Sequence, residues 1–151
     1  MRLSLLFLKG ENKNMIKKTV NYVDFNEMER TEDLHFHMTE PELIKLSVSK
    51  EGGFERYIDR MIQTNNMKEV VAVLEEVIQL TYGVKTDDGR FVKNKENLEK
   101  FLSSEAYNVV FMEIAQNAAT AAEFINGVIP KNLSKKVEES IANAGAQTPT
   151  A

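Results

Sequence analysis

The chain has 151 residues, 42% hydrophobic and 28% charged, which is typical of one soluble globular domain. It contains no cysteine, which excludes disulfide scaffolds, thiolate metal sites and cysteine nucleophiles and suits a reducing cytoplasm. Nineteen Lys and Arg residues against 23 Asp and Glu residues give a net charge of −4, so the chain lacks the positive field that nucleic acid binding requires.

The N-terminal segment, residues 1–14, contains a short apolar run at positions 3–8. The run is too short for a secretory signal, and no later segment reaches the roughly 20 apolar residues that span a bilayer. We therefore predict a cytosolic protein without membrane contact. Residues 9–14 (KGENKN) are typical of a purine-rich ribosome-binding site translated in frame, which favours Met15 as the start and makes residues 1–14 non-native. A disordered N-terminal arm is the alternative.

A β-hairpin is predicted next. Residues 16–25 are rich in β-branched and aromatic side chains, and residues 30–38 alternate, which places Leu34, Phe36 and Met38 on one face. Residues 26–29 form the predicted turn. The opposite face carries Asp33, His35 and His37, and we expect it to face water.

Three helices are predicted between residues 39 and 83. Thr39 and Glu42 form a capping box for a helix that runs to about Ser49. A glycine pair at positions 52–53 separates it from an amphipathic helix that ends at residues 65–66. The heavily apolar stretch 67–80 predicts a central helix, with Gly83 as its C-cap.

The remainder is predicted to be helical after a turn at residues 86–90 and a short strand or ordered loop at 91–92. Asn94 caps a short helix, and Ser103 or Ser104 caps one long helix from about residue 105 to 126. The alanines in its second half suit close approach of another backbone. After Pro130 we predict a short amphipathic helix over 133–141 and a disordered tail over 143–151.

The predicted fold class is therefore α+β, mainly α, with an N-terminal β-hairpin packed on a bundle of about five helices. We expect residues 1–14 to be a non-native or disordered extension, residues 15–130 a single domain, and residues 131–151 a short helix and disordered tail. Tyr22, Phe25, Tyr107 and Phe111 are predicted core aromatics, and a charge at Phe111 is expected to unfold the domain.

Candidate catalytic chemistry is sparse. His35 and His37 share a strand face with Asp33, which suggests a metal-dependent enzyme, but the chain has only two histidines and a zinc site needs a third ligand in fixed geometry. We interpret both as surface histidines. Asp87 and Asp88 lack the spacing of a calcium loop and indicate a turn. We predict no catalytic, cofactor-binding or metal-binding residues, and we expect the seven methionines mainly to fill the core.

Several segments together resemble a family of small tail proteins from long-tailed bacteriophages of the siphophage type, the tail assembly chaperones. The resemblance covers about residues 16–130. It is carried by YVDFN at 22–26, ERTED at 29–33, YGVK at 82–85, DGRF at 88–91, EAY at 105–107, FME at 111–113 and FINGVIP at 124–130.

This resemblance implies a non-enzymatic protein of the bacterial host cytoplasm that binds the tape measure protein and helps tail tube protein assemble around it. Self-association is left open. The alternative is a structural virion component, such as a tail-completion or head–tail joining protein. The resemblance also implies a longer product made by ribosomal frameshifting, and the codons of Lys135 and Lys136 are the candidate slippery run. The alternative interpretation of Lys135 and Lys136 is a basic pair on a solvated helix.

Overall fold

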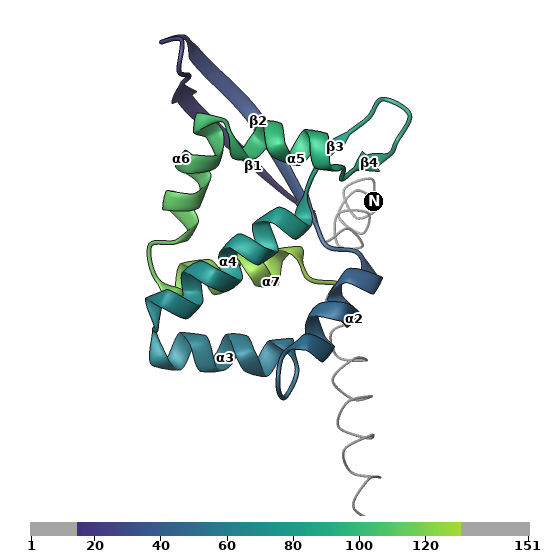
Figure 1. The fold of residues 1–151 in the computed structure, drawn as a ribbon, viewed down its shortest axis with the longest axis vertical. Coiled ribbons are helices and arrows are strands. Elements are labelled where there is room, and N and C mark those ends of the chain that lie inside the picture. The colour runs from purple at the N-terminus through teal and green to yellow at the C-terminus, as the bar shows by residue number, and fades with distance from the viewer. Residues whose placement is uncertain (1–14, 131–151) are drawn as a thin grey trace, which may run out of the picture.

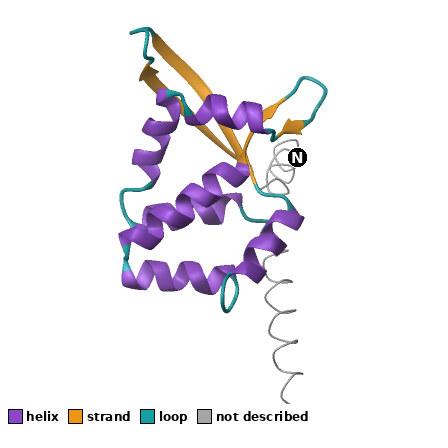
Figure 2. Cartoon of the chain, in the orientation of Figure 1, coloured by secondary structure: helices purple, strands orange, loops and turns teal. Residues whose placement is uncertain are grey.

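The computed structural model describes residues 15–130, which contain four strands and six helices. The fold is α+β and mainly α, with an N-terminal hairpin lying against the helices, as predicted (Figures 1 and 2). The expectations for residues 1–14, for the helix at 133–141, for Lys135 and Lys136 and for the tail at 143–151 fall outside the described residues.

The sheet is antiparallel, with strand order β1-β2-β3-β4. Strands β1 (Met15–Val23) and β2 (Glu29–His37) form the predicted hairpin, with Val20 opposite Glu32. The short strands β3 (Tyr82–Lys85) and β4 (Phe91–Val92) extend the sheet beside β2. Of the two alternatives for residues 91–92, a short strand or an ordered loop, the structure shows the strand. The closed end of the β1–β2 hairpin projects beyond the helices (Figure 1).

The hairpin turn begins earlier than predicted. β1 ends at Val23, so Phe25 lies in the turn itself, where 71% of its surface is exposed. The prediction of Phe25 as a core residue is therefore wrong. The strand pattern of alternating side chains continues only up to the last paired residue, and beyond it a side chain follows the geometry of the turn.

The next three helices follow their predicted boundaries. α2 (Glu40–Ser49) starts with the predicted capping box, in which Glu42 N donates to Thr39 Oγ1 and Thr39 N donates to Glu42 Oε1. α3 (Phe54–Thr64) follows the glycine pair and ends at Asn65, which adopts a left-handed conformation. α4 (Met67–Thr81) is the central helix, with six buried positions.

Gly83 is not the C-cap of α4. Tyr82 occupies that position, and Gly83 is a residue of β3 opposite His35. A Cβ at Gly83 would lie 2.5 Å from the Phe91 ring, so glycine is needed here to let β4 pack closely. The sequence pattern identified the end of the helix, but it did not indicate that the chain enters a strand directly.

The predicted long helix is two helices. After α5 (Lys95–Leu102), α6 (Glu105–Ile114) and α7 (Ala118–Val128) are separated by three residues. Asn117 caps α7 by accepting from Thr120 N at 2.8 Å, and Asn65 Oδ1 accepts from Ala118 N at 3.1 Å. The apolar spacing of three and four residues continues across the break, which is why periodicity alone predicted one helix.

Of the two predicted helix caps before α5 and α6, the structure shows the side-chain cap only at α5. Asn94 accepts from Asn97 N at 2.8 Å and so caps α5. Ser104 occupies the N-cap position of α6, but its hydroxyl donates to the carbonyl of Phe101 rather than accepting from α6.

The core is formed where one face of the hairpin meets the helices. Leu34, Phe36 and Met38 are buried, as their alternation predicted. Phe36 lies at the centre of an aromatic cluster, with its ring centroid 5.9, 6.0 and 5.3 Å from those of Tyr82, Phe101 and Phe124 respectively. Tyr22, Tyr107 and Phe111 are half-buried at its margin.

The alanines of α7 serve the internal packing of the domain. Ala118, Ala121 and Ala122 are buried, and α7 packs against α4, β1 and α3. Small side chains let these elements approach closely. Of the alanines in the first half of α7, Ala119 is exposed. Because the other three are buried inside the domain, they are not available to contact an external helix.

One lysine links three elements of the fold. Lys93, just after β4, donates through Nζ to Glu42 Oε1 at 2.5 Å, to the carbonyl of His37 at 2.9 Å and to the carbonyl of Leu80 at 3.1 Å. Its side chain is only 17% exposed. The ammonium group therefore connects the first turn of α2 with the ends of β2 and α4 through hydrogen bonds.

Candidate functional site

The two histidines lie at the junction of β2 with β3. Asp33 is exposed, as predicted, but His35 and His37 are half-buried because β3 and β4 extend the sheet beside them. The His37 ring packs edge-on against Phe91 with centroids 5.9 Å apart. Burial, helped by the nearby Lys85, lowers the pKa of His35 below its ordinary value. The neutral form of His35 is therefore favoured in the fold.

These side chains do not assemble into a metal centre. Within residues 15–130 there is no group of three or more histidine, aspartate or glutamate side chains that could hold a metal ion. The Nδ1 atom of His37 is buried and finds no hydrogen-bond partner among the described residues. Asp33 instead accepts a hydrogen bond from Thr19 on the adjacent strand, at 2.6 Å.

The aspartates at positions 87 and 88 belong to the β3–β4 turn, as predicted. Thr86 N donates to the carbonyl of Arg90 at 2.9 Å, and Gly89 takes a positive φ of 86°. The Thr86 hydroxyl bonds to the Asp88 carboxylate. The Asp88 carboxylate therefore contributes to the turn itself.

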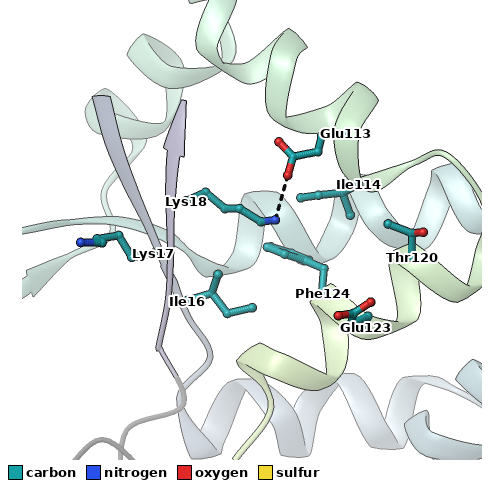
Figure 3. A pocket seen from close by; sticks show the side chains of 8 residues that line it. All are labelled: Ile16, Lys17, Lys18, Glu113, Ile114, Thr120, Glu123 and Phe124. Carbon is teal, nitrogen blue, oxygen red and sulfur yellow. Dashed lines mark hydrogen bonds and ion pairs between the residues drawn. The ribbon is translucent and has the colours of Figure 1, made fainter. Parts of the chain in front are cut away.

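A cleft of about 290 Å³ lies between β1 and the α6–α7 corner (Figure 3). Its base is apolar, with Ile114 and Phe124 almost fully buried. Lys18 reaches across it to Glu113 with Nζ 3.1 Å from Oε1, whereas Lys17 points to the other side of the strand (Figure 3). The remaining lining residues are Ile16, Thr120 and Glu123.

The ion pair across the cleft is exposed to solvent. The Lys18 and Glu113 side chains are 31% and 49% exposed, so the ion pair that spans the cleft is solvated and weak. The cleft thus combines an apolar base with a solvated ion pair across its opening.

The large apolar side chains that are at least 45% exposed lie at three places on the described surface. Val23, Phe25 and Met28 lie at the closed end of the hairpin and are 53%, 71% and 60% exposed. Ile44 and Val48 lie one turn apart on α2, and Met112 is exposed on α6. Only Met38 and Met61 of the methionines between residues 15 and 130 are fully buried, so the expectation that methionine mainly fills the core is wrong for this part of the chain.

These observations describe a small α+β protein with exposed apolar side chains and a cleft whose base is apolar. None of the helices between residues 15 and 130 has the length and hydropathy needed to cross a membrane. A family model described as phage tail assembly chaperone matches residues 15–151. The chain belongs to the phage tail assembly chaperone family. The match continues beyond Pro130, where the resemblance seen in the sequence ended. No curated protein and no solved structure matches the chain.

Proposed function

We propose that this protein binds the phage tape measure protein in the bacterial host cytoplasm and assists assembly of tail tube protein around it, without being an enzyme. The family match over residues 15–151 is the observation that carries the proposal. The exposed apolar side chains and the mildly acidic surface support binding to proteins rather than to nucleic acid or anionic membrane.

A tape measure protein poses a physical problem that such a partner solves. A very long helical chain exposes apolar stripes until the tube surrounds it, and exposed stripes aggregate. A small partner that covers these stripes keeps the client soluble. Because the client must then be transferred to the tube, binding of modest affinity suits the role better than permanent association.

The test is co-expression of the full chain with the tape measure protein of the same phage. We expect the tape measure protein to be soluble in the presence of the chaperone and to co-purify with it. A tape measure protein that is equally soluble and remains unbound with and without this partner contradicts the proposal.

Proteomics of purified virions separates this function from the alternative of a structural virion component. A chaperone is scarce or absent in the finished particle, whereas a tail-completion or joining protein is present in the fixed ratio of a ring. Stoichiometric incorporation would therefore replace the chaperone assignment with the structural one.

A further inference from the structure

The closed end of the β1–β2 hairpin exposes apolar side chains on a part of the chain that the body of the protein does not cover. Val23, Phe25 and Met28 fall within six consecutive residues, and 53%, 71% and 60% of their surfaces are exposed. This end projects away from the helices (Figure 1). We call residues 23–28 the hairpin tip.

The hairpin tip is held in a defined conformation. Asp24 Oδ1 accepts from the backbone N–H groups of Asn26 and Met28, each at 2.9 Å, and its Oδ2 accepts from Arg30 Nε at 2.5 Å. Asp24 N donates to the carbonyl of Met28 at 2.8 Å, which closes the loop. The carboxylate thus organises the backbone that presents Phe25 to solvent, and a preorganised loop loses little entropy on binding.

The strands below the tip are tied together by side chains as well. Tyr22 Oη donates to Glu32 Oε1 at 2.7 Å on one face, and Thr31 Oγ1 donates to Asn21 Oδ1 at 2.7 Å on the other. These bonds connect the two strands directly below the tip. Phe25 and Met28 therefore lie at the end of a hairpin whose strands are held together by side-chain as well as backbone hydrogen bonds.

The negative charge of the protein is concentrated at the same end. Residues 22–33 contain five carboxylates and one guanidinium, a net charge of −4, which equals the net charge of the whole chain. The remaining residues contain 18 acidic and 18 basic side chains and are balanced. An acidic projection with an apolar end is complementary to an apolar pocket surrounded by Lys and Arg and is repelled by phosphate backbones.

We propose that the hairpin tip is the docking element for the client protein, and that Phe25 and Met28 enter an apolar pocket rimmed by basic side chains on that protein. This inference rests on the proposed function and assigns it a surface. Aromatic side chains that become fully buried at the centre of an interface dominate binding energy, and the surrounding carboxylates orient the approach.

The experiment is a competition for the co-expressed, tagged tape measure protein between the wild-type chain and a Phe25→Ser variant distinguished by mass. The ratio of the two chaperones bound to the client is compared with their ratio in the lysate. We expect the variant to be depleted at least about tenfold, because burying a phenylalanine ring contributes about 1.5–3 kcal/mol. Phe25 is exposed in the free protein, so thermal unfolding of the variant should match that of the wild type.

Val48→Ser and Met112→Ser are the matched controls, because these side chains are 71% and 70% exposed but lie on α2 and α6. We expect both to compete equally with the wild type. If Phe25→Ser also competes equally, or if the controls are depleted as strongly, the hairpin tip is not the docking element and the proposed function still stands. If the wild type binds no tape measure protein, the proposed function fails and this inference fails with it.

The acidic charge is tested separately with a Glu27→Gln, Glu29→Gln double variant. We expect weaker client binding and a smaller loss of binding on raising salt from about 50 to about 300 mM, since fewer charges remain to be screened. Glu96→Gln with Glu99→Gln, on the exposed face of α5, is the control with the same change in net charge. An equal salt response in both double variants overturns the basic-rimmed pocket.

Discussion

Replacing Lys93 with methionine tests whether a single ammonium group joins three elements of the fold. Methionine keeps an unbranched stem but removes three hydrogen bonds, to Glu42, to the carbonyl of His37 and to the carbonyl of Leu80. The Lys93 and Glu42 side chains are only 17% and 24% exposed, so water replaces these bonds incompletely.

The expected loss of stability follows from these contacts. Each carbonyl that loses a charged donor costs about 1 kcal/mol, and the partly buried ion pair adds about 1–2 kcal/mol. The sum, about 3–4 kcal/mol, is a large part of the 5–15 kcal/mol that stabilises a typical domain. We expect urea unfolding followed by circular dichroism to show a correspondingly lower free energy of unfolding, with an unchanged slope.

Lys95→Met is the matched control, because the Lys95 side chain is 89% exposed and its nearest carboxylate, on Glu99, lies 3.9 Å away. This variant should lose less than about 0.5 kcal/mol. A Glu42→Gln variant keeps an acceptor for Thr39 N, so a double-mutant cycle with Lys93→Met isolates the ion pair. A Lys93→Met variant that is as stable as Lys95→Met would refute the linking role.

Two further predictions concern single side chains. Asn65→Ala should lower the free energy of unfolding in urea by about 2–3 kcal/mol, because it removes the hydrogen bond to Ala118 N and places alanine in a left-handed conformation. Asn65→Gly removes only the hydrogen bond and should cost about 1 kcal/mol. Equal losses in the two variants would contradict a separate cost of the backbone conformation. The hydrogen bond from Arg30, aided by those from the Met28 and Asn26 amides, lowers the pKa of Asp24 below its ordinary value of 3.8. The contribution of Asp24 to stability is therefore present above that pH and is lost as the pH falls through the lowered pKa. Asp24→Asn should therefore lower the midpoint of thermal unfolding at pH 7 but have no effect in strong acid, and a deficit that persists undiminished in acid would show that the pKa shift is not its cause.

The sequence predicted those features that depend on local signals. The capping box at Thr39 and Glu42, the alternation that buries Phe36 and the turn before Phe91 each involve residues close together in the chain. Local hydrogen bonds and periodicity therefore sufficed to place most elements.

The features that the sequence did not reveal depend on distant partners or on turn geometry. Asn65 meets the start of α7 across 53 residues, and Lys93 meets Glu42 across 51, so neither contact leaves a periodic signal. Phe25 looked like a strand residue because its hydrophobicity fits a strand. Its exposure follows from the early end of β1, which depends on the Asp24 carboxylate binding the turn backbone. Phe25 was the one tip residue predicted to lie in the core, and its exposure is the part of the tip that the sequence did not reveal.

The packing of β1 against α6 and α7 sets the order in which the protein can fold as it is synthesised. Lys18 and Glu113 are 95 residues apart. At a synthesis rate of roughly 5–20 residues per second, α6 is therefore complete about 5–20 s after β1 has been made. A two-stranded hairpin is marginally stable by itself, and Phe36 is incompletely covered during that interval because Phe124 of α7 packs against its ring. The nascent chain thus exposes the apolar face of its own hairpin to the cell until α7 leaves the ribosome and closes over it.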